Sequence, residues 1–163
     1  MFNVGDYVIH NRELCKIKDI KDNNVSGEDK YYVLNPIDDK SLTISVPINN
    51  KNESLRSVIS KEIALNLIKE IPKIEIIDSN DKLIESEYKA LMNSNTFEGL
   101  IKIIKTTYMR NDERLKANKK IGEKDKFYFE KAGKYLYDEF SIALEMTFDE
   151  VKTFVINEVK TLL

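Results

Sequence analysis

A histidine and a cysteine five residues apart are the side chains of this sequence that could most readily take part in chemistry. His10 is the only histidine and Cys15 the only cysteine. A thiol beside an imidazole can act as an activated nucleophile, whereas a zinc site would need carboxylate ligands from elsewhere in the chain. We interpret Cys15 as a small buried thiol and His10 as a turn or surface residue. A Cys–His nucleophile pair is the alternative.

Other arrangements typical of catalysis are missing from the sequence. The chain has five glycines, and they do not form a Gly-rich phosphate-binding loop. The carboxylates of Asp112-Glu113 and of Asp149-Glu150 are adjacent, and adjacent side chains on a helix do not face each other. Neither pair can therefore work as a general acid and base. We expect a protein that is not an enzyme and that uses no metal or cofactor.

The composition is that of a folded protein. The chain has 163 residues, of which 42% are hydrophobic, enough for one or two small domains. No stretch approaches the roughly 18 apolar residues of a membrane span, and the first residues lack the features of a secretory signal. A lone cysteine fits a reducing compartment. We expect a cytoplasmic protein without membrane contact.

Charge is unevenly distributed, although the net charge is only −2. Residues 102–134 contain eleven lysines and arginines against five acidic residues, and residues 135–163 contain two against six. One interpretation is that these are ordinary solvated helix faces. The other is that the first segment forms a basic patch that contacts phosphates.

Short apolar runs between turn signals predict strands in the first part of the chain. The clearest lie around 7–9, 31–34 and 42–46; the last of these alternates in polarity and stops at Pro47. Four or five short strands within about 60 residues are typical of a small antiparallel barrel. We assign residues 1–57 to this domain.

Helical spacing of apolar residues replaces this pattern near Ser60. A helix is expected before Pro72, and residues 58–80 are assigned to that helix and a linker. Within residues 81–163 we expect a helix start at Asn95, a long helix from Glu123 to about Met146, and a final helix after a capping box at Thr147. The predicted fold class is α+β, with a small antiparallel β-barrel followed by an all-α helical domain.

Three blocks of the N-terminal part resemble a known family. They are residues 2–17 (FNVGDYVIH, then LCKI), 31–34 (YYVL) and 42–47 (LTISVP). In this order they are similar to the opening strands of the CarD family and of the matching domain in the transcription-repair coupling factor. No helicase motifs follow, so the chain resembles the CarD type. In that family a Tudor-like barrel is followed by a helical domain.

The resemblance implies a transcription regulator that binds the β subunit of bacterial RNA polymerase through its barrel. An exposed strand edge suits such docking because its backbone groups can pair with another strand. The candidate edge is Lys40 to Val46. The expected polymerase-binding residues are Leu42, Thr43, Ile44, Ser45, Val46 and Pro47.

The resemblance also implies that the helical domain contacts promoter DNA at the upstream fork, where an aromatic wedge helps to hold the strands apart. This chain has no tryptophan, and the wedge position, shortly before Tyr88-Lys89, falls on about Ile84. Ile84 either wedges the DNA or packs inside the helical domain. The expected DNA-binding residues are Ile84, Lys89, Arg110, Arg114, Lys119, Lys120 and Lys124.

The function expected from these features is stabilisation of the promoter open complex by a monomer bound to polymerase and DNA. The alternative is a protein–protein adaptor on RNA polymerase that does not bind DNA. The absent tryptophan and the net negative charge favour this alternative.

Overall fold

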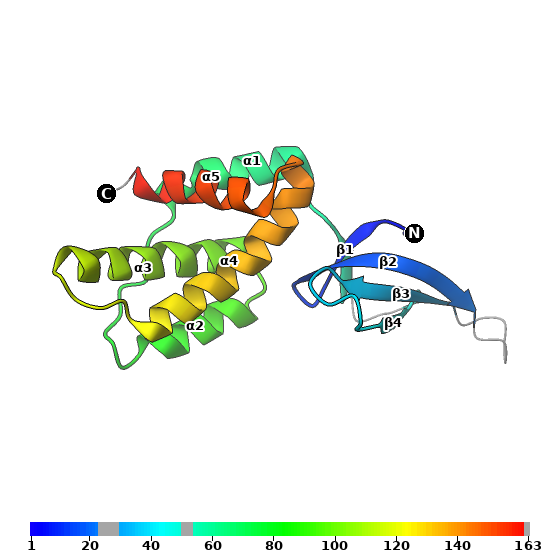
Figure 1. Ribbon diagram of the computed structural model, residues 1–163, viewed down its shortest axis with the longest axis horizontal. Helices are drawn as coiled ribbons and strands as arrows, with labels where there is room; N and C mark the ends of the chain where they lie inside the picture. Colours follow the sequence, from blue (N-terminus) through cyan, green and yellow to red (C-terminus); the bar gives the residue numbers. More distant parts are fainter. Residues whose placement is uncertain (23–29, 50–53, 162–163) are drawn as a thin grey trace. The chain divides into compact units, whose positions relative to one another are not determined.

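The computed structural model describes residues 1–22, 30–49 and 54–161. The chain divides into two compact units, Met1–Ile59 and Ser60–Leu163. The first contains strands and the second contains helices (Figure 1). The predicted α+β class is therefore confirmed, and each unit is described by itself.

The described part of the first unit forms one antiparallel sheet of five strands. They are β1 (Tyr7–His10), β2 (Glu13–Asp22), β3 (Lys30–Pro36), β4 (Ile44–Pro47) and β5 (Leu55–Ser57). Their order is β4-β3-β2-β1-β5, so β4 and β5 are the two edges. Because β4 and β5 do not pair within the described residues, the sheet is open, and the expected closure into a barrel is not confirmed.

One face of the sheet carries the main core cluster of the first unit, and Ile9, Leu14 and Val33 on the other face are buried as well. The main cluster is made by six residues. Its buried side chains come from β1 to β4 and are Val8, Cys15, Ile17, Tyr32, Leu34 and Val46. Burial, together with nearby Glu13, raises the pKa of the Cys15 thiol to about 11. A thiol that stays protonated at neutral pH is a poor nucleophile. The interpretation of Cys15 as a buried thiol is thus confirmed.

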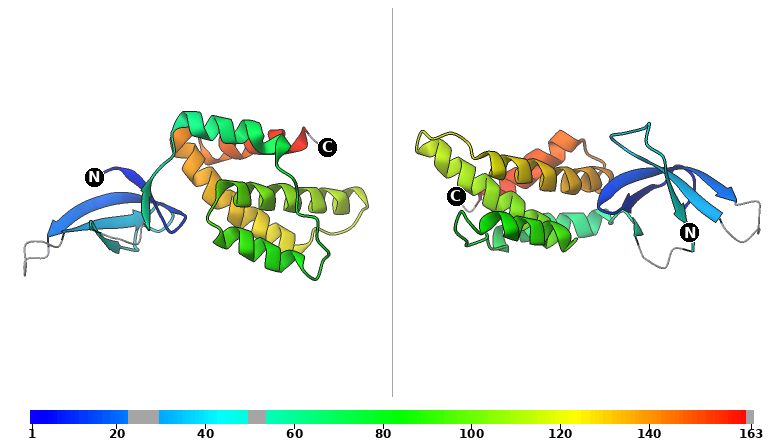
Figure 2. Two further views of the ribbon diagram at one scale, coloured as in Figure 1. Left: turned by 180° about the vertical axis from the view of Figure 1, so that it is seen from behind. Right: turned by 90° about the horizontal axis from the view of Figure 1, so that it is seen from below.

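The second unit is a helical domain built around α3 and α4 (Figure 2). Its helices are α1 (Lys61–Glu70), the 3-10 turn η1 (Ile71–Lys73), α2 (Ile84–Asn93), α3 (Phe97–Lys116), α4 (Glu123–Leu144) and α5 (Phe148–Lys160). The long helix and the capping box at Thr147 are confirmed. The helix start expected at Asn95 is one residue early: Thr96 caps α3, and Asn95 adopts a positive φ of 57° in the turn before it.

The segment assigned to a helix and linker is part of the helical domain. Helix α1 buries Ala64 and Ile68 and contacts α4 and α5. The following residues are bonded to α3, because the Lys105 ammonium donates to the carbonyls of Ile71 (2.8 Å) and Ile74 (2.5 Å). The helix expected before Pro72 is therefore present as α1, and the residues that we assigned to a linker after it are bonded to the helical domain. A lysine on an otherwise apolar helix face gave no sign of the carbonyls that it would satisfy.

Candidate functional site

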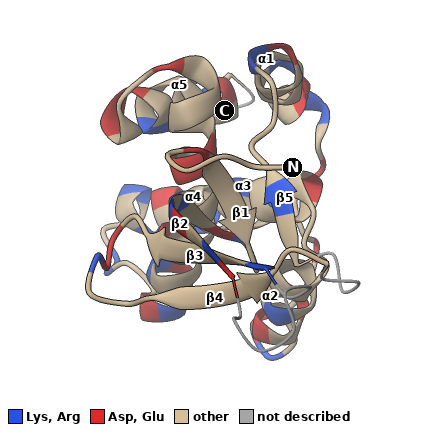
Figure 3. Ribbon diagram, turned by 90° about the vertical axis from the view of Figure 1, so that its right-hand side faces the viewer, with Lys and Arg blue, Asp and Glu red and all other residues tan. Residues whose placement is uncertain are grey.

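The first candidate surface is the open edge of β4. This strand pairs with β3 on one side, and no strand of the described residues pairs with its other side. The sequence of β4 contains no charged residue, and the strand is uncoloured along its length in Figure 3. Proteins usually protect such edges with charge, bulges or a cover. The edge of β4 has no charge and no strand of the described residues covers it, so it is suited to pairing with another chain over a short length that ends at Pro47.

The hydrogen-bond register shows which backbone groups of β4 point outward. The Ile48 amide donates to the Lys30 carbonyl (2.9 Å), one step beyond the Tyr31–Pro47 pair. Hydrogen-bonded and non-bonded pairs alternate along an antiparallel ladder. The amides and carbonyls of Ile44 and Val46 therefore point to β3, and those of Ser45 point away from the sheet.

The other edge strand, β5, differs from β4 in its charge and in its outward backbone groups. It contains Arg56, and part of the β5 ribbon is blue in Figure 3. The Arg56 guanidinium donates to the Ser57 carbonyl (3.1 Å). By the same alternation, starting from the bond between the Asn11 amide and the Ser54 carbonyl, the backbone groups of Ser57 point away from β1. One outward carbonyl of β5 is thus already bonded, and a charge stands beside it.

Two polar side chains set the path of the chain into β4. The Asn35 amide group donates to the Leu42 carbonyl (2.8 Å) and to the Lys40 carbonyl (3.4 Å). Asp39 accepts hydrogen bonds from the side chain and the amide of Ser41. These bonds, with that from the Ser41 hydroxyl first, lower the pKa of the Asp39 carboxyl. The turn before β4 is therefore organised by its own short-range bonds.

The expected polymerase-binding residues do not all present a side chain. Leu42 and Thr43 precede the strand and are exposed, as are Ser45 and Pro47, whereas Ile44 is half-buried. Val46 is 3% exposed and belongs to the core. Val46 was wrongly included as a contact residue, because its side chain faces inward and its backbone faces β3.

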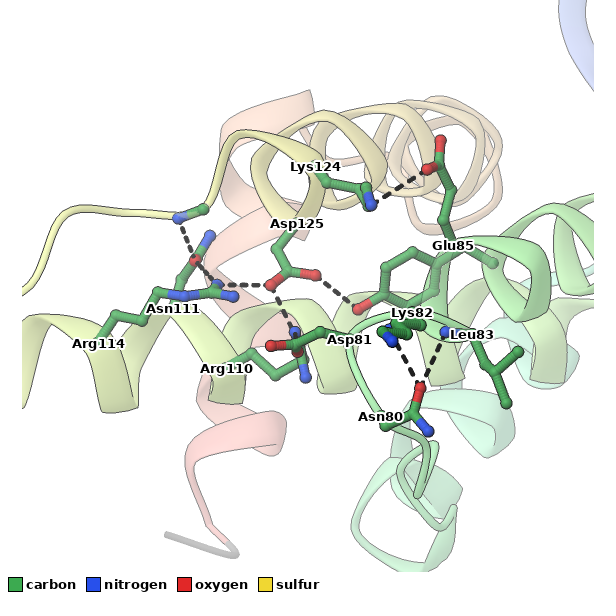
Figure 4. Close-up of polar contacts among 12 residues, drawn as sticks. Asn80, Asp81, Lys82, Leu83, Glu85, Arg110, Asn111, Arg114, Lys124 and Asp125 are labelled. Carbon is green, nitrogen blue, oxygen red and sulfur yellow. Dashed lines mark hydrogen bonds and ion pairs between the residues drawn. The ribbon is translucent and has the colours of Figure 1, made fainter.

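The second candidate surface surrounds a buried carboxylate in the helical unit (Figure 4). Asp125, at the start of α4, is 2% exposed. It accepts hydrogen bonds from the Tyr88 hydroxyl (2.7 Å), Arg110 Nε (3.0 Å) and Arg114 Nη1 (2.5 Å). Asp81 pairs with the other side of Arg110 at 2.6 Å. One carboxylate thus joins α2, α3 and α4.

These contacts shift the pKa values of Asp125 and Tyr88. Burial alone would raise the pKa of Asp125, but the hydrogen bonds from Tyr88, Arg114 and Arg110 outweigh it and hold the pKa below its ordinary value. Burial and the bond to Asp125 raise the pKa of the Tyr88 hydroxyl. Asp125 is therefore ionised at neutral pH and offsets positive charge from the two arginines.

The loop between α3 and α4 is held by the same cluster. The side-chain carbonyl of Asn111 accepts from Arg114 Nη1 (2.6 Å) and from the Gly122 amide (2.9 Å). A Cβ on Gly122 would lie 2.5 Å from Arg114 Nη1, so any other residue there would require the guanidinium to shift. The loop residues Lys119 and Lys120 are exposed.

The expected DNA-binding residues are brought to one end of the helical unit, but most are already engaged. Arg110 and Arg114 bind Asp125, and Lys89 and Lys124 flank Glu85 at 3.8 and 3.2 Å. Within the described residues, no ion pair involves Lys119 or Lys120. Sequence reasoning missed Asp125, Asn111 and Glu85. The available signal was the spacing of the two arginines, which places them on one face of a helix.

Ile84 is 2% exposed, in the first turn of α2. Its side chain lies in the interior of the helical unit and is not presented to a ligand. Of the two interpretations of this residue, the structure supports packing and contradicts the wedge. An isoleucine in the first turn of an amphipathic helix can face the interior or the solvent. The packing of α2 against α3 determined that Ile84 faces the interior.

The described residues show no group of three or more His, Cys, Asp or Glu side chains that could hold a metal ion. None of the helices in the described ranges combines the length and apolar character needed to traverse a bilayer.

Comparison with known proteins identifies the sheet unit. The family model for the CarD-like/TRCF RID domain matches residues 2–59, which is nearly the whole of that unit and ends at its boundary. The resemblance in the three strand blocks is thereby confirmed. No curated protein matches the chain significantly. The helical unit lies outside the family match.

Burial of Ile84 predicts that changes there act on stability. Ile84→Ala should lower the free energy of unfolding by about 2–4 kcal/mol through the cavity it leaves, and Ile84→Trp should lower it by about 1–3 kcal/mol through overpacking. Urea denaturation measures both. Leu83→Ala is the control, because its side chain is 55% exposed and should change stability by less than about 0.5 kcal/mol. A stable Ile84→Trp protein that prolongs open-complex lifetime would contradict the interior position.

The Asp125 cluster predicts a pH-dependent contribution to stability. Asp125→Asn removes the charge between two partly buried arginines and should cost about 2 kcal/mol at neutral pH. Because the folded-state pKa of Asp125 is lowered, this contribution is complete above the ordinary value of 3.8 and disappears as the pH falls through the folded-state value.

The matched control for Asp125→Asn is Asp112→Asn. Asp112 pairs with Lys116 one turn away on α3, at 2.9 Å. That pair joins an exposed lysine to a half-buried carboxylate and should contribute less than about 1 kcal/mol. If urea denaturation at neutral pH gives both variants the same loss in free energy of unfolding, the Asp125 cluster contributes no more to stability than the Asp112–Lys116 pair.

Proposed function

We propose, from the CarD-like/TRCF RID domain that residues 2–59 form, that this protein is a transcription regulator that binds the β subunit of bacterial RNA polymerase. The match to this domain supports an interaction with RNA polymerase. The observation that carries the finer proposal is the unprotected edge of β4. We further propose that the protein acts in the cytoplasm, as a monomer and without catalysis, and that its sheet is an open version of the Tudor-like barrel.

The docking mode we propose is addition of a polymerase strand to β4. Ser45 offers an outward amide and carbonyl, while Pro47 has no amide to offer and ends the pairing. The exposed side chains of Leu42 and Thr43 lie next to this short backbone edge. Main-chain bonds would provide affinity and these neighbouring side chains would provide specificity.

The second part of the proposal is contact with DNA at the upstream fork, which would stabilise the open complex. It is supported by Lys119 and Lys120, exposed in the loop before α4. The amides at the start of α4 also favour anions. Such contacts strengthen binding to phosphates without reading sequence.

A second candidate function is a protein–protein adaptor on RNA polymerase that does not touch DNA. The buried position of Ile84 favours it, because no wedge residue remains at that position. The carboxylates of Asp81 and Glu85 favour it as well, since they stand beside the same arginines and lysines. Cations that are already paired gain less from a phosphate.

The edge proposal predicts that Ser45→Pro weakens polymerase binding while the sheet stays folded. Proline at this position removes an outward donor and leaves the bonds to β3 in place. Loss of one main-chain bond should reduce affinity for RNA polymerase core enzyme by about tenfold. Biolayer interferometry measures the affinity, and circular dichroism with urea denaturation verifies the fold.

Ser57→Pro on β5 is the matched control for this experiment. It makes the same replacement at an outward-facing position of the opposite edge. We expect its affinity for polymerase to equal that of the unaltered protein. If Ser57→Pro weakens binding and Ser45→Pro does not, the docking edge is β5.

DNA contact and the adaptor function are separated by the salt dependence of DNA binding. If the loop binds phosphates, replacing Lys119 and Lys120 together by glutamine should lower the slope of log K against log salt by up to about two on forked promoter DNA. Replacing Lys61 and Lys69, which are exposed on α1, should leave the slope unchanged. Failure of the full chain to bind the DNA, with polymerase binding intact, would establish the adaptor.

A further inference from the structure

We propose that the sheet unit carries a second docking site, a lysine-rimmed groove that binds an extended acidic polypeptide segment with apolar side chains at its centre. The groove has a volume of about 720 Å³. It lies on the face of β1, β2 and β3 and is separate from the outward backbone groups of β4. This site goes beyond the proposed polymerase contact and does not depend on it.

The groove is placed on the face opposite the core. Tyr7, Lys16 and Asn35 lie in one cross-strand row. This row is next to the row of Val8, Cys15 and Pro36, whose first two members belong to the core. Neighbouring rows of a sheet project to opposite faces. Tyr7, Lys16 and Asn35 therefore point away from the core.

A bulge in β2 adds a second cation to this face. The register with β3 moves from Ile17–Leu34 to Asp19–Val33, which leaves Lys18 as the extra residue. Bulges re-aim side chains in this way. Lys16 and Lys18 both line the groove, and Lys40 lines it from the turn after β3.

The N-terminal segment forms one wall. The Gly5 amide donates to the Ile17 carbonyl (2.8 Å), and the Ile17 amide donates to the Asp6 carbonyl (2.9 Å). Gly5 has a φ of +93°, a conformation that other residues rarely adopt, and it turns the chain so that Val4 borders the groove. Val4 is 58% exposed, and Ile37 adds apolar surface from the turn after β3.

The charges around the groove are available to an acidic ligand. Within the described residues, no ion pair involves Lys16, Lys18 or Lys40. The Lys16 ammonium lies 5.3 Å from the centre of the Tyr7 ring, which holds it over the groove. Among the described residues that line the groove there is no carboxylate, and nearby Asp19 accepts from the Ile20 amide at 2.8 Å. Three lysines thus line a groove whose other lining residues are apolar or uncharged.

The combination of three lysines with apolar surface fits a peptide better than a nucleic acid. The sheet unit as a whole contains eight basic and nine acidic residues, so a uniformly charged polyanion gains no attraction from the unit as a whole. A peptide can place a few carboxylates near the lysines and lay apolar side chains on Val4 and Ile37. Burial of those side chains supplies the non-directional part of the affinity.

The proposal is tested by titrating the isotope-labelled full chain with a short capped peptide in which glutamates flank a central leucine–phenylalanine pair. The amide signals of Tyr7, Lys16 and Asn35 should shift. Reversing Lys16, Lys18 and Lys40 together to glutamate should weaken binding roughly tenfold, as expected for three exposed ion pairs. Val4→Asp, which adds a carboxylate to the wall, should also weaken it.

Charge-matched controls define the outcomes. Reversal of Lys21, Lys30 and Lys61, all exposed and outside the groove, should leave peptide affinity within about twofold. Absence of shifts with the acidic peptide would overturn the proposal. Equal shifts with the same peptide carrying lysines, or stronger binding of a single-stranded oligonucleotide to the same residues, would overturn it too. Polymerase binding, measured on the triple variant, reports separately on the β4 edge.

Discussion

The buried carboxylate of Asp125 is the interaction on which the arrangement of the helical unit depends. A charge taken out of water must be paired and hydrogen-bonded, or its burial costs several kcal/mol. Asp125 meets this requirement through Tyr88, Arg110 and Arg114, which come from α2 and α3. Their placement fixes the start of α4 and the close passage of Gly122. Arg110 and Arg114 are thus bound within the fold, whereas the loop residues Lys119 and Lys120 are among the exposed cations of the unit.

The sheet unit depends on a different constraint, the alternation of a pleated strand. It gives β4 an inward side chain at Val46 and outward backbone groups at Ser45. It also separates the core face from the face that carries Tyr7 and Lys16. One short sheet thereby offers two surfaces of different chemistry: a backbone edge without charge and an apolar groove rimmed by lysine.

The two units differ in the features that they carry. The sheet unit holds the family match and both proposed docking surfaces, while the helical unit pairs several of its cations with its own carboxylates. Residues 102–134 are therefore rich in basic side chains, but ion pairs leave a smaller basic surface than this composition suggests. Carboxylates distant in sequence, Asp81 and Glu85 among them, neutralise part of it.

The sequence by itself determined what neighbouring residues control. Strand β4 and its end at Pro47, the span of α4 and the capping box at Thr147 follow from periodicity and local hydrogen bonds, and the strand blocks indicated the domain family that matches residues 2–59. Tertiary structure decided the rest. Whether Ile84 faces the interior, whether Arg110 meets a carboxylate, and whether residues 71–77 link or pack are set by groups 15 to 37 positions apart. Short-range sequence patterns do not indicate such distant partners, because burial and ion pairing arise only when helices pack together.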